Sequence, residues 1–177
     1  MSEVRDPYPQ AYVEYLVQFH AVRDYFECHE ILEDYWKDHP DSPHRETWVM
    51  LIQLAVSLYH ERRGNRAGAV KLMTGAISRF NAEHMRQLGV DGERLLEMMQ
   101  RRLDALRSGI DVPYIDLNLP IIDGQLMRRC EERAEELGRA FGQASDMTDE
   151  YLLNRHKLRD REAERQARLA ALAKRRS

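Results

Sequence analysis

Three residues with acid–base or metal-binding chemistry lie close together near the start of the chain. His29 and Glu33 are four residues apart, and Glu30 follows the histidine directly. On a helix, residues four apart share one face, so His29 and Glu33 are expected to be neighbours. An imidazole beside carboxylates can transfer a proton or bind a metal ion. The stretch 25–38 is therefore the first place to look for chemistry.

A second polar set stands in an otherwise apolar stretch. Between residues 46 and 61, Gln53, Ser57 and His60 recur at helical spacing while nearly all their neighbours are apolar. Buried polar groups need hydrogen-bond partners, and the nearest stretch that offers them at a matching spacing is 25–38. We therefore predict that this polar stripe faces the 25–38 helix. The predicted polar cluster consists of His29, Glu30, Glu33, Gln53 and His60.

Two interpretations of the predicted cluster stay open. In the interpretation that we favour, the side chains hydrogen-bond to one another and fix the register of two helices. In the other, they form a metal-dependent or acid–base catalytic site between helices. We expect no metal, and the sequence identifies no cofactor. If a metal were bound, its ligands would be His29, Glu33 and His60, with Glu30 as a base or as a partner of the ligands.

Residue spacing argues against two familiar metal sites. The stretch 29–33 is similar to the zinc-peptidase pattern of two histidines four residues apart, but Glu33 stands in place of the second histidine. A di-iron carboxylate site needs Glu-x-x-His on two helices and two further glutamates. Glu27-Cys28-His29 has the wrong spacing for that motif.

The pattern of apolar residues predicts a helical protein. Apolar residues recur at spacings of three and four, and strand patterns are nearly absent. The stretch 46–61 is apolar around nearly its whole circumference, so it should be the central helix. Prolines and Gly124 make 112–124 an extended segment that lies across the bundle. Helices are expected at about 10–22, 25–38, 46–61, 66–82, 91–107, 125–141 and 148–174.

These elements predict an all-α fold. We expect a compact helical bundle of about five to six helices, with an extended segment near 112–124 and an exposed C-terminal helix. The bundle domain should cover 1–142, and a basic helical extension should cover 143–177. A chain of 177 residues is long enough for such a bundle to bury a core of its own.

Charge is distributed unevenly along the chain. The net charge is −3, but residues 1–150 hold 18 Lys and Arg against 27 Asp and Glu, while 151–177 hold 9 against 3. The basic residues of the second part are interrupted by acidic ones, and no aromatic residue follows Tyr151 for base stacking. We therefore expect a solvated helix rather than a nucleic-acid arm, and no nucleic-acid partner.

The remaining features concern compartment and partners. Cys28 and Cys130 form neither a CxxC pair nor a disulfide framework, which favours a reducing compartment. The N-terminus lacks the pattern of a secretory signal, and no apolar stretch is long enough to span a membrane. We therefore expect a cytoplasmic location and no membrane association. The expected partner is a further copy of this chain or another protein.

Three ordered motifs resemble a known family. The stretches 19–37, 51–69 and 114–121 are similar to the bacterial family named domain of unknown function 309, and the resemblance covers most of residues 8–125. It implies a small all-helical bundle, and it implies no activity, cofactor or catalytic residue. The implied signature elements are Phe26-Glu27-Cys28-His29-Glu30 and Tyr59-His60 with Arg63-Gly64-Asn65.

Two classes of function follow from these observations. The first is a non-enzymatic binding or scaffold module with a buried His, Glu and Gln network. The alternative is a metal-dependent hydrolase or another enzyme centred on the predicted polar cluster. An open position beside convergent side chains would favour chemistry, whereas side chains that satisfy one another would favour the binding module.

Overall fold

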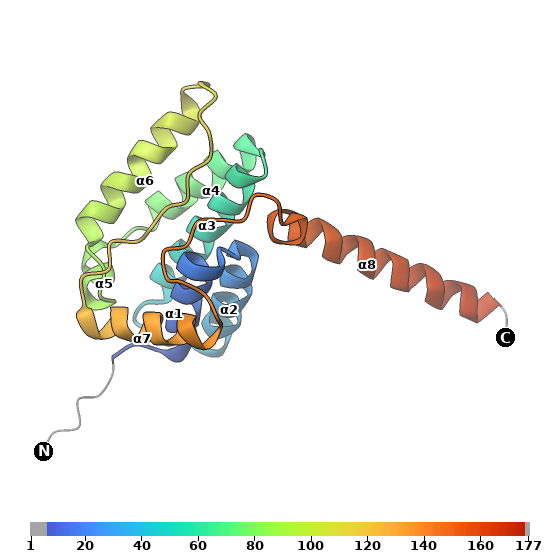
Figure 1. Ribbon diagram of the computed structural model, residues 1–177, viewed down its shortest axis with the longest axis horizontal. Helices are drawn as coiled ribbons and strands as arrows, with labels where there is room; N and C mark the ends of the chain where they lie inside the picture. Colours follow the sequence, from blue (N-terminus) through green and yellow to red (C-terminus); the bar gives the residue numbers. More distant parts are fainter. Residues whose placement is uncertain (1–6, 176–177) are drawn as a thin grey trace, which may run out of the picture. The chain divides into compact units, whose positions relative to one another are not determined.

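The computed structural model describes the backbone of residues 7–175 and, apart from 156–164 and 175, their side chains. The described chain is all-α (Figure 1). No strand forms within it, and one antiparallel bridge joins Val90 to Ile121. The helices are α1 (Gln10–Val17), η1 (Gln18–Val22), α2 (Tyr25–Asp38), α3 (Arg45–Arg62), α4 (Arg66–Ser78), α5 (Ala82–Gln87), α6 (Gly92–Arg107), α7 (Gly124–Glu136) and α8 (Glu150–Arg175).

The described helices belong to two compact units. The first unit is Met1–Ser145 and the second is Asp146–Ser177. The first contains α1 to α7, and the second contains α8, whose backbone leaves the helical conformation at Asn154. The division lies shortly after residue 142, where the sequence predicted the end of the bundle. None of the described helices combines the length and the apolar character needed to cross a membrane.

Helix α3 is the central helix of the first unit, as the sequence predicted. It packs against α2 on one side and α4 on another. Its side chains Trp48, Leu51, Leu54 and Leu58 are almost completely buried. Because apolar residues occur around most of its circumference, α3 can bury surface against several neighbours at once.

Aromatic residues of α1 pack in the core beside α3, and the hydroxyl groups of two of them, Tyr12 and Tyr15, donate hydrogen bonds to backbone carbonyls. The hydroxyl of Tyr12 donates to the carbonyl of Leu88 at 2.8 Å, and that of Tyr15 donates to the carbonyl of Leu51 at 2.7 Å. Burial raises the pKa of both tyrosines well above its usual value. Each hydroxyl therefore stays protonated and ties α1 to a distant part of the chain.

Helix bounds agree with the sequence predictions in most places, since α1 and η1 together cover the predicted 10–22, and they differ after α4 and at the end of α7. The first helix has a π-helical last turn, η1, which ends at Arg23 in the left-handed conformation with φ of 61°. Helix α4 ends at Ser78 rather than at 82. A short helix that was not predicted, α5, follows it, because the Asn81 side chain accepts from the backbone N–H of His84 and starts a new helix. Helix α7 ends at Glu136 rather than at 141.

Apolar periodicity predicts that nine side chains of α2, α3 and α4 belong to the core, and in the structure they fall into two groups. Leu32, Leu51, Leu54 and Leu58 are fully buried. The other predicted core side chains are only partly buried: Ile31, Trp36, Val56, Leu72 and Ile77. Helices α2 and α4 each pack one face against α3, so residues at the edges of these two contacts keep some exposed surface.

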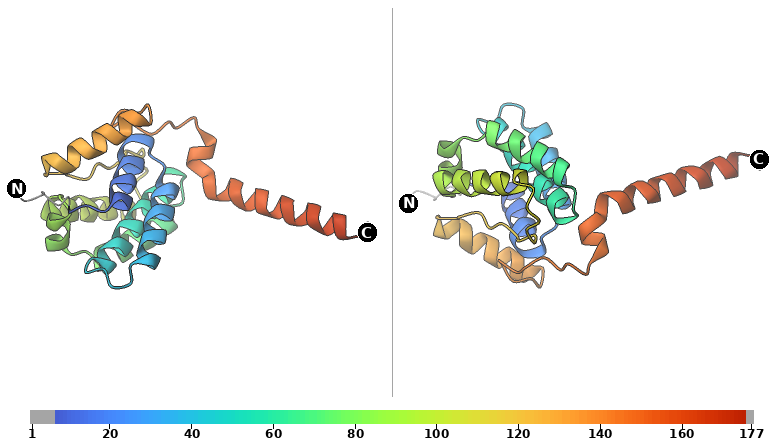
Figure 2. Two further views of the ribbon diagram at one scale, coloured as in Figure 1. Left: turned by 90° about the horizontal axis from the view of Figure 1, so that it is seen from below. Right: turned by 90° about the horizontal axis from the view of Figure 1, so that it is seen from above.

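The segment between α6 and α7 is extended, as predicted. After Gly109, which adopts a φ of +74°, the chain turns back and runs alongside α6 toward that helix's N-terminus (Figures 1 and 2). The backbone N–H of Asp91 donates to the carbonyl of Pro120 at 2.9 Å, and that of Ile122 donates to the carbonyl of Gly89 at 2.8 Å. The segment is therefore fixed at its far end and antiparallel to α6.

The central position of α3 predicts a large effect of Leu54→Ala. Because Leu54 is completely buried, truncation should open a cavity and lower the free energy of unfolding by about 2–5 kcal/mol. Urea denaturation followed by circular dichroism measures this loss. The matched control is Ile122→Ala, whose side chain is 63% exposed and should change stability by less than about 0.5 kcal/mol. Equal effects of the two changes would contradict the core assignment.

Candidate functional site

The first part of the predicted cluster lies along one side of α2. The Nε2 of His29 is 2.6 Å from Oε2 of Glu33, and the Nζ of Lys37 is 3.1 Å from Oε1 of the same carboxylate. The hydrogen bond from Lys37 and the nearby His29 lower the pKa of Glu33, although partial burial acts in the opposite direction. The side chains of His29 and Glu33 are 29% and 34% exposed, and Glu30 beside them is also partly buried. The ionised Glu33 therefore orients the His29 ring.

The second part of the predicted cluster lies against α4. The hydroxyl of Ser57 donates to a backbone carbonyl of α4 at 2.8 Å. A Cβ added at Gly75 would lie 3.1 Å from Nε2 of Gln53, and one added at Gly68 would lie 3.1 Å from Cγ of His60. The side chains of Gln53, Ser57 and His60 therefore all lie against α4.

This placement corrects the prediction that the stripe faces α2. Gly68 and Gly75 carry no Cβ, so α4 comes close enough to α3 to cover the polar side chains of Gln53, Ser57 and His60. Helix α2, by contrast, buries mainly apolar side chains against its neighbours. The prediction was wrong because the position of the polar stripe depends on the small residues of α4, which leave room for polar side chains. It does not depend on the polar residues of α2.

Several polar atoms of this region have no hydrogen-bond partner among the described residues. They are Nδ1 of His29, Nε1 of Trp36 and Oε1 of Gln53, all of them buried. Moreover, the described part of the chain holds no group of three or more His, Cys, Asp or Glu side chains placed to bind a metal ion. The ligand set considered from the sequence, His29, Glu33 and His60, is therefore not assembled.

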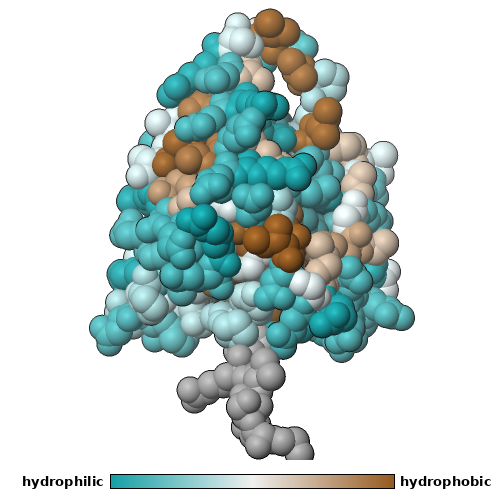
Figure 3. Space-filling view, turned by 90° about the vertical axis from the view of Figure 1, so that its left-hand side faces the viewer, coloured by the Kyte–Doolittle hydropathy of each residue, from teal (hydrophilic) through white to brown (hydrophobic). Residues whose placement is uncertain are grey.

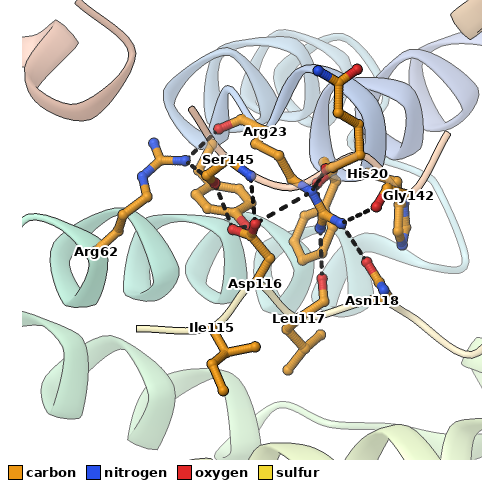
Figure 4. A network of polar contacts seen from close by, with 12 residues as sticks. His20, Arg23, Arg62, Ile115, Asp116, Leu117, Asn118, Gly142 and Ser145 are labelled. Atoms are coloured by element: carbon orange, nitrogen blue, oxygen red, sulfur yellow. Dashed lines mark hydrogen bonds and ion pairs between the residues drawn. The ribbon is translucent and has the colours of Figure 1, made fainter. Parts of the chain in front are cut away.

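A different polar network, which the sequence analysis did not identify, is centred on the buried Arg23. This residue lies between η1 and α2, and 1% of its surface is exposed. Its Nε donates to the carbonyl of Gln143 at 2.7 Å, and its Nη2 donates to Oδ1 of Asn118 at 2.6 Å (Figure 4). Further acceptors are the carbonyls of Phe19, Leu117 and Gly142. The guanidinium thus joins three separate stretches of the chain.

Asp116 supplies the negative charge of this network. Its Oδ2 lies 3.9 Å from Nε of Arg23 and accepts from the backbone N–H of Ser145 at 2.6 Å. Its Oδ1 accepts from the hydroxyls of Tyr25, Tyr114 and Ser145. Burial alone would raise the pKa of Asp116, but the hydrogen bonds from Ser145 and Tyr114 and the nearby Arg23 lower it. The carboxylate is therefore ionised, and its oxygens are occupied.

Arg62, at the end of α3, completes the network. Its Nη1 donates to the carbonyl of Arg23 at 2.7 Å and to the hydroxyl of Ser145 at 3.0 Å. Its guanidinium also lies 4.6 Å from the centre of the Tyr25 ring. The network thus pairs the charged groups of Arg62, Arg23 and Asp116 with partners inside the protein. This favours a structural role over a catalytic one.

His20 is fixed beside this network as a neutral imidazole. Its Nδ1 is 2.8 Å from the carbonyl of Leu16, and its Nε2 accepts from the backbone N–H of Leu119 at 2.9 Å. The ring also stacks on Phe141. Burial lowers the pKa of His20 to about 3; the hydrogen bond to the Leu16 carbonyl acts in the opposite direction, and the nearby Arg23 adds a smaller lowering effect. His20 thus holds the extended segment and is not available as a base.

The two cysteines are also unsuited to chemistry. Both are buried and free of disulfide bonds. Burial raises the pKa of Cys28 well above its usual value and that of Cys130 to about 12. Because the thiolate is the reactive form, neither side chain is a nucleophile near neutral pH.

A weak sequence signal for the Arg23 network does exist. Asp116 is the single acidic residue in the otherwise uncharged stretch 114–121, and Arg23-Asp24 interrupts two helices rich in apolar residues. Charged residues in such settings are either exposed or paired. The sequence does not say which partner each one has, because the partners lie far away in the chain.

A cleft opens on the other side of the extended segment. It has a volume of about 420 Å³ and lies between the end of α3, the start of α4, the last turns of α6 and residues 110–115. Its charged lining residues are Glu61, Arg66, Arg101, Arg102 and Asp111. Its apolar lining includes Leu106, Ile110, Val112 and Ile115. Figure 3 shows hydrophobic residues at the surface near the top of the view, where α6 passes into this segment.

Arg102 forms the inner wall of the cleft. Its Nε donates to Oε1 of Glu61 at 3.1 Å, and its Nη2 also donates to the carbonyl of Ile115. Its guanidinium lies 5.3 Å from the centre of the Tyr114 ring. Arg102 therefore connects α6 to α3 and to the extended segment, and its own charge is balanced by Glu61.

Comparison with known proteins identifies the family of this chain. A family model described as "Domain of unknown function (DUF309)" matches residues 12–72. A relative named "Uncharacterized protein YpuF", from Bacillus subtilis (strain 168), is 46% identical over 156 residues, which cover 87% of this chain and 88% of that protein. The chain belongs to the DUF309 family, an assignment that the three sequence motifs had predicted. No solved structure matches the chain.

The Arg23 network predicts different effects of two C-terminal truncations. Ending the chain after Ser145 keeps every bond to Arg23 and Asp116, so the bundle should unfold cooperatively with a stability within about 1 kcal/mol of the full chain. Ending it after Gly138 removes the carbonyls of Gly142 and Gln143 and leaves a buried guanidinium short of partners. That loss should exceed about 3 kcal/mol in urea denaturation. Equal stability of the two truncated chains would rule out the proposed importance of these contacts.

The buried His20 predicts that stability falls in mild acid. The pKa of His20 in the folded chain is about 3, whereas an unfolded histidine has its usual value of about 6.5. The unfolded chain therefore takes up a proton first as the pH falls below about 6.5, and stability is lost at up to about 1.4 kcal/mol per pH unit until the folded group titrates. In the variant His20→Asn, the slope of unfolding free energy against pH should be smaller by that amount. Parallel slopes would contradict a neutral buried His20.

Proposed function

We propose that this protein is a non-enzymatic binding module, and that the cleft beside α6 is its ligand site. The observation that carries the proposal is the combination of apolar and basic side chains in one hollow. Its volume of about 420 Å³ lies within the range of sites that hold small ligands or parts of larger ones. The other polar groups described above serve the fold.

The apolar side chains of the cleft support a ligand that covers them. Three apolar residues of the lining are largely exposed: Ile110 by 66%, Val112 by 56% and Ile115 by 69%. They line the same cleft and still leave this surface in contact with water. A cluster of exposed large apolar side chains is unfavourable in water and is characteristic of binding surfaces. A ligand with an apolar part would therefore be stabilised here.

The basic side chains of the cleft support a negatively charged ligand. Arg66 donates from Nη2 to the carbonyl of Ile110 at 3.2 Å, and Arg101 donates from Nη2 to Glu97. A guanidinium has five N–H donors, so each residue has further donors beyond the one in this bond. These arginines belong to the part of the chain, residues 1–150, in which acidic residues outnumber basic ones. A ligand that is both apolar and anionic fits these groups best.

The enzyme alternative has one observation in its favour. Glu33 holds the Nε2 of His29 at 2.6 Å, and a carboxylate that orients an imidazole is a common arrangement in acid–base catalysis. However, the other ring nitrogen of His29 is buried, so a substrate has no described route to it. An enzyme centred here would lose its turnover in the variant His29→Gln while its cleft still bound ligands.

Binding of 8-anilinonaphthalene-1-sulfonate, an apolar anion, tests the cleft. It should bind the full chain saturably with increased fluorescence, and Ala105→Glu should weaken binding by about tenfold, because Ala105 lines the cleft and the new carboxylate repels the sulfonate. The control Ala105→Gln has the same length without the charge and should bind within about twofold of the unchanged chain. If both variants bind as the unchanged chain does, the dye binds elsewhere and the proposal fails.

A further inference from the structure

The extended segment beside α6 has a backbone that is largely without protein partners. Between residues 111 and 116, one backbone group is bonded within the described structure, the carbonyl of Ile115, which accepts from Arg102. Asp91 holds the segment at its far end through Pro120, and Arg66 holds it near the start through Ile110. The segment is thus held extended at both ends while its middle still offers peptide donors and acceptors.

A second hollow continues the cleft along α6. It has a volume of about 550 Å³ and lies between Arg94 and Met98 of α6 and residues 116–120 of the extended segment. The two hollows meet at Arg101 and Arg102, which line both. We infer from these shared lining residues that the hollows form one path beside the extended segment, which Figures 1 and 2 show running along α6.

Charge along this path favours an acidic occupant. Arg66, Arg94, Arg101 and Arg102 line it. Three acidic residues line it: Glu61 is bonded to Arg102, Asp116 is bonded within the Arg23 network, and Asp111 lies at the start of the extended segment. A ligand therefore meets the positive charges of Arg66, Arg94 and Arg101, the last of which is shared with Glu97, and the single negative charge of Asp111, so basic groups outnumber acidic ones.

We propose that the occupant of this path is an extended segment of a partner protein, in which acidic and apolar residues alternate. The inference rests on the proposed binding function of the cleft and names its ligand. The peptide pairs its backbone with residues 111–116 in the manner of an added strand. Its acidic side chains reach the arginines of α6, while its apolar side chains cover Val112 and Ile115.

The dimensions of the path set the length of this peptide. From Arg94 to Ala105, α6 rises by about 16 Å at 1.5 Å per residue. An extended peptide covers this distance in about five residues, since each residue advances by about 3.3 Å. Successive side chains of such a peptide point to opposite sides, which matches an alternation of acidic and apolar residues.

A single-stranded nucleic acid is the less suitable occupant. Sequence-tolerant binding of single strands combines basic residues with exposed aromatic rings on which bases stack. Tyr114 is the aromatic residue in the lining of the two hollows. Its ring lies under Arg102, and its hydroxyl is bonded to Asp116. The free groups of the path are peptide groups and isolated arginines, which suit a peptide.

Fluorescence anisotropy with labelled peptides tests the inference on the full chain. The probe is a peptide of about six residues in which valine and glutamate alternate. Two matched peptides accompany it: one with lysine in place of glutamate, and one with methylated backbone nitrogens, which cannot donate hydrogen bonds. A polyuridine strand of similar length is the nucleic-acid probe. We expect the valine–glutamate peptide to bind at least about tenfold more tightly than either matched peptide and than the nucleic acid.

Two charge reversals locate the binding site. Arg101→Glu should weaken the valine–glutamate peptide by at least about tenfold, whereas Arg128→Glu on α7, which lines neither hollow, should leave it within about twofold. Both residues are exposed, so neither change should unfold the chain. Ile115→Asp provides a second test, since it removes an apolar contact and adds a repelling charge.

The outcomes separate this inference from the proposed function. Unchanged affinity of the methylated peptide would overturn strand-like pairing, and tighter binding of the nucleic acid would overturn the choice of a peptide. Failure of every peptide, while 8-anilinonaphthalene-1-sulfonate still binds and Ala105→Glu still weakens it, would overturn the inference and leave the cleft as a site for small anions. Failure of the dye and the peptides together would overturn both proposals.

Discussion

The fold depends on the burial of one positive charge, that of Arg23. A buried guanidinium is strongly unfavourable unless its donors are satisfied. Arg23 satisfies them with carbonyls of Phe19, Leu117, Gly142 and Gln143 and with the side chain of Asn118. These groups come from the end of the first helix, from the extended segment and from the chain after α7. The charge is therefore tolerated only when all three stretches are in place, and it makes their positions interdependent.

This interdependence explains how an extended segment survives in an all-helical protein. Residues 117–119 are fixed from the inside, because Arg23 binds the Leu117 carbonyl and His20 accepts from the Leu119 N–H. Residues 111–116 have one bonded backbone group in the described structure, the carbonyl of Ile115, and Val112 and Ile115 expose apolar side chains. The same segment is thus bound into the core at one end and exposes apolar side chains at the other. A fold that had paired the segment in a sheet would have no such surface.

The polar stripe of α3 shows how a contact that holds two helices together and a site built between helices can look alike in sequence. Gln53, Ser57 and His60 recur at helical spacing on an apolar helix, which is the pattern expected of a site built between helices. In the folded chain they meet the glycines of α4, and Ser57 is bonded to the α4 backbone. Polar side chains that bridge two closely packed helices fix the register of those helices. Their presence in an apolar helix does not require chemistry.

Local physics determined the helices, and long-range packing determined the site. Apolar periodicity and caps such as Asp91 and Asn65 act within a few residues, so the sequence alone gave the bounds of α2 and α6 closely. Neither the partners of Arg23 nor the direction of the Gln53 stripe could be read in this way. They depend on which distant residues become neighbours and on how much room Gly68 and Gly75 leave, and only the folded chain decides that. The cleft arises for the same reason, because its walls come from α3, α4, α6 and the extended segment, which meet only after the bundle has formed.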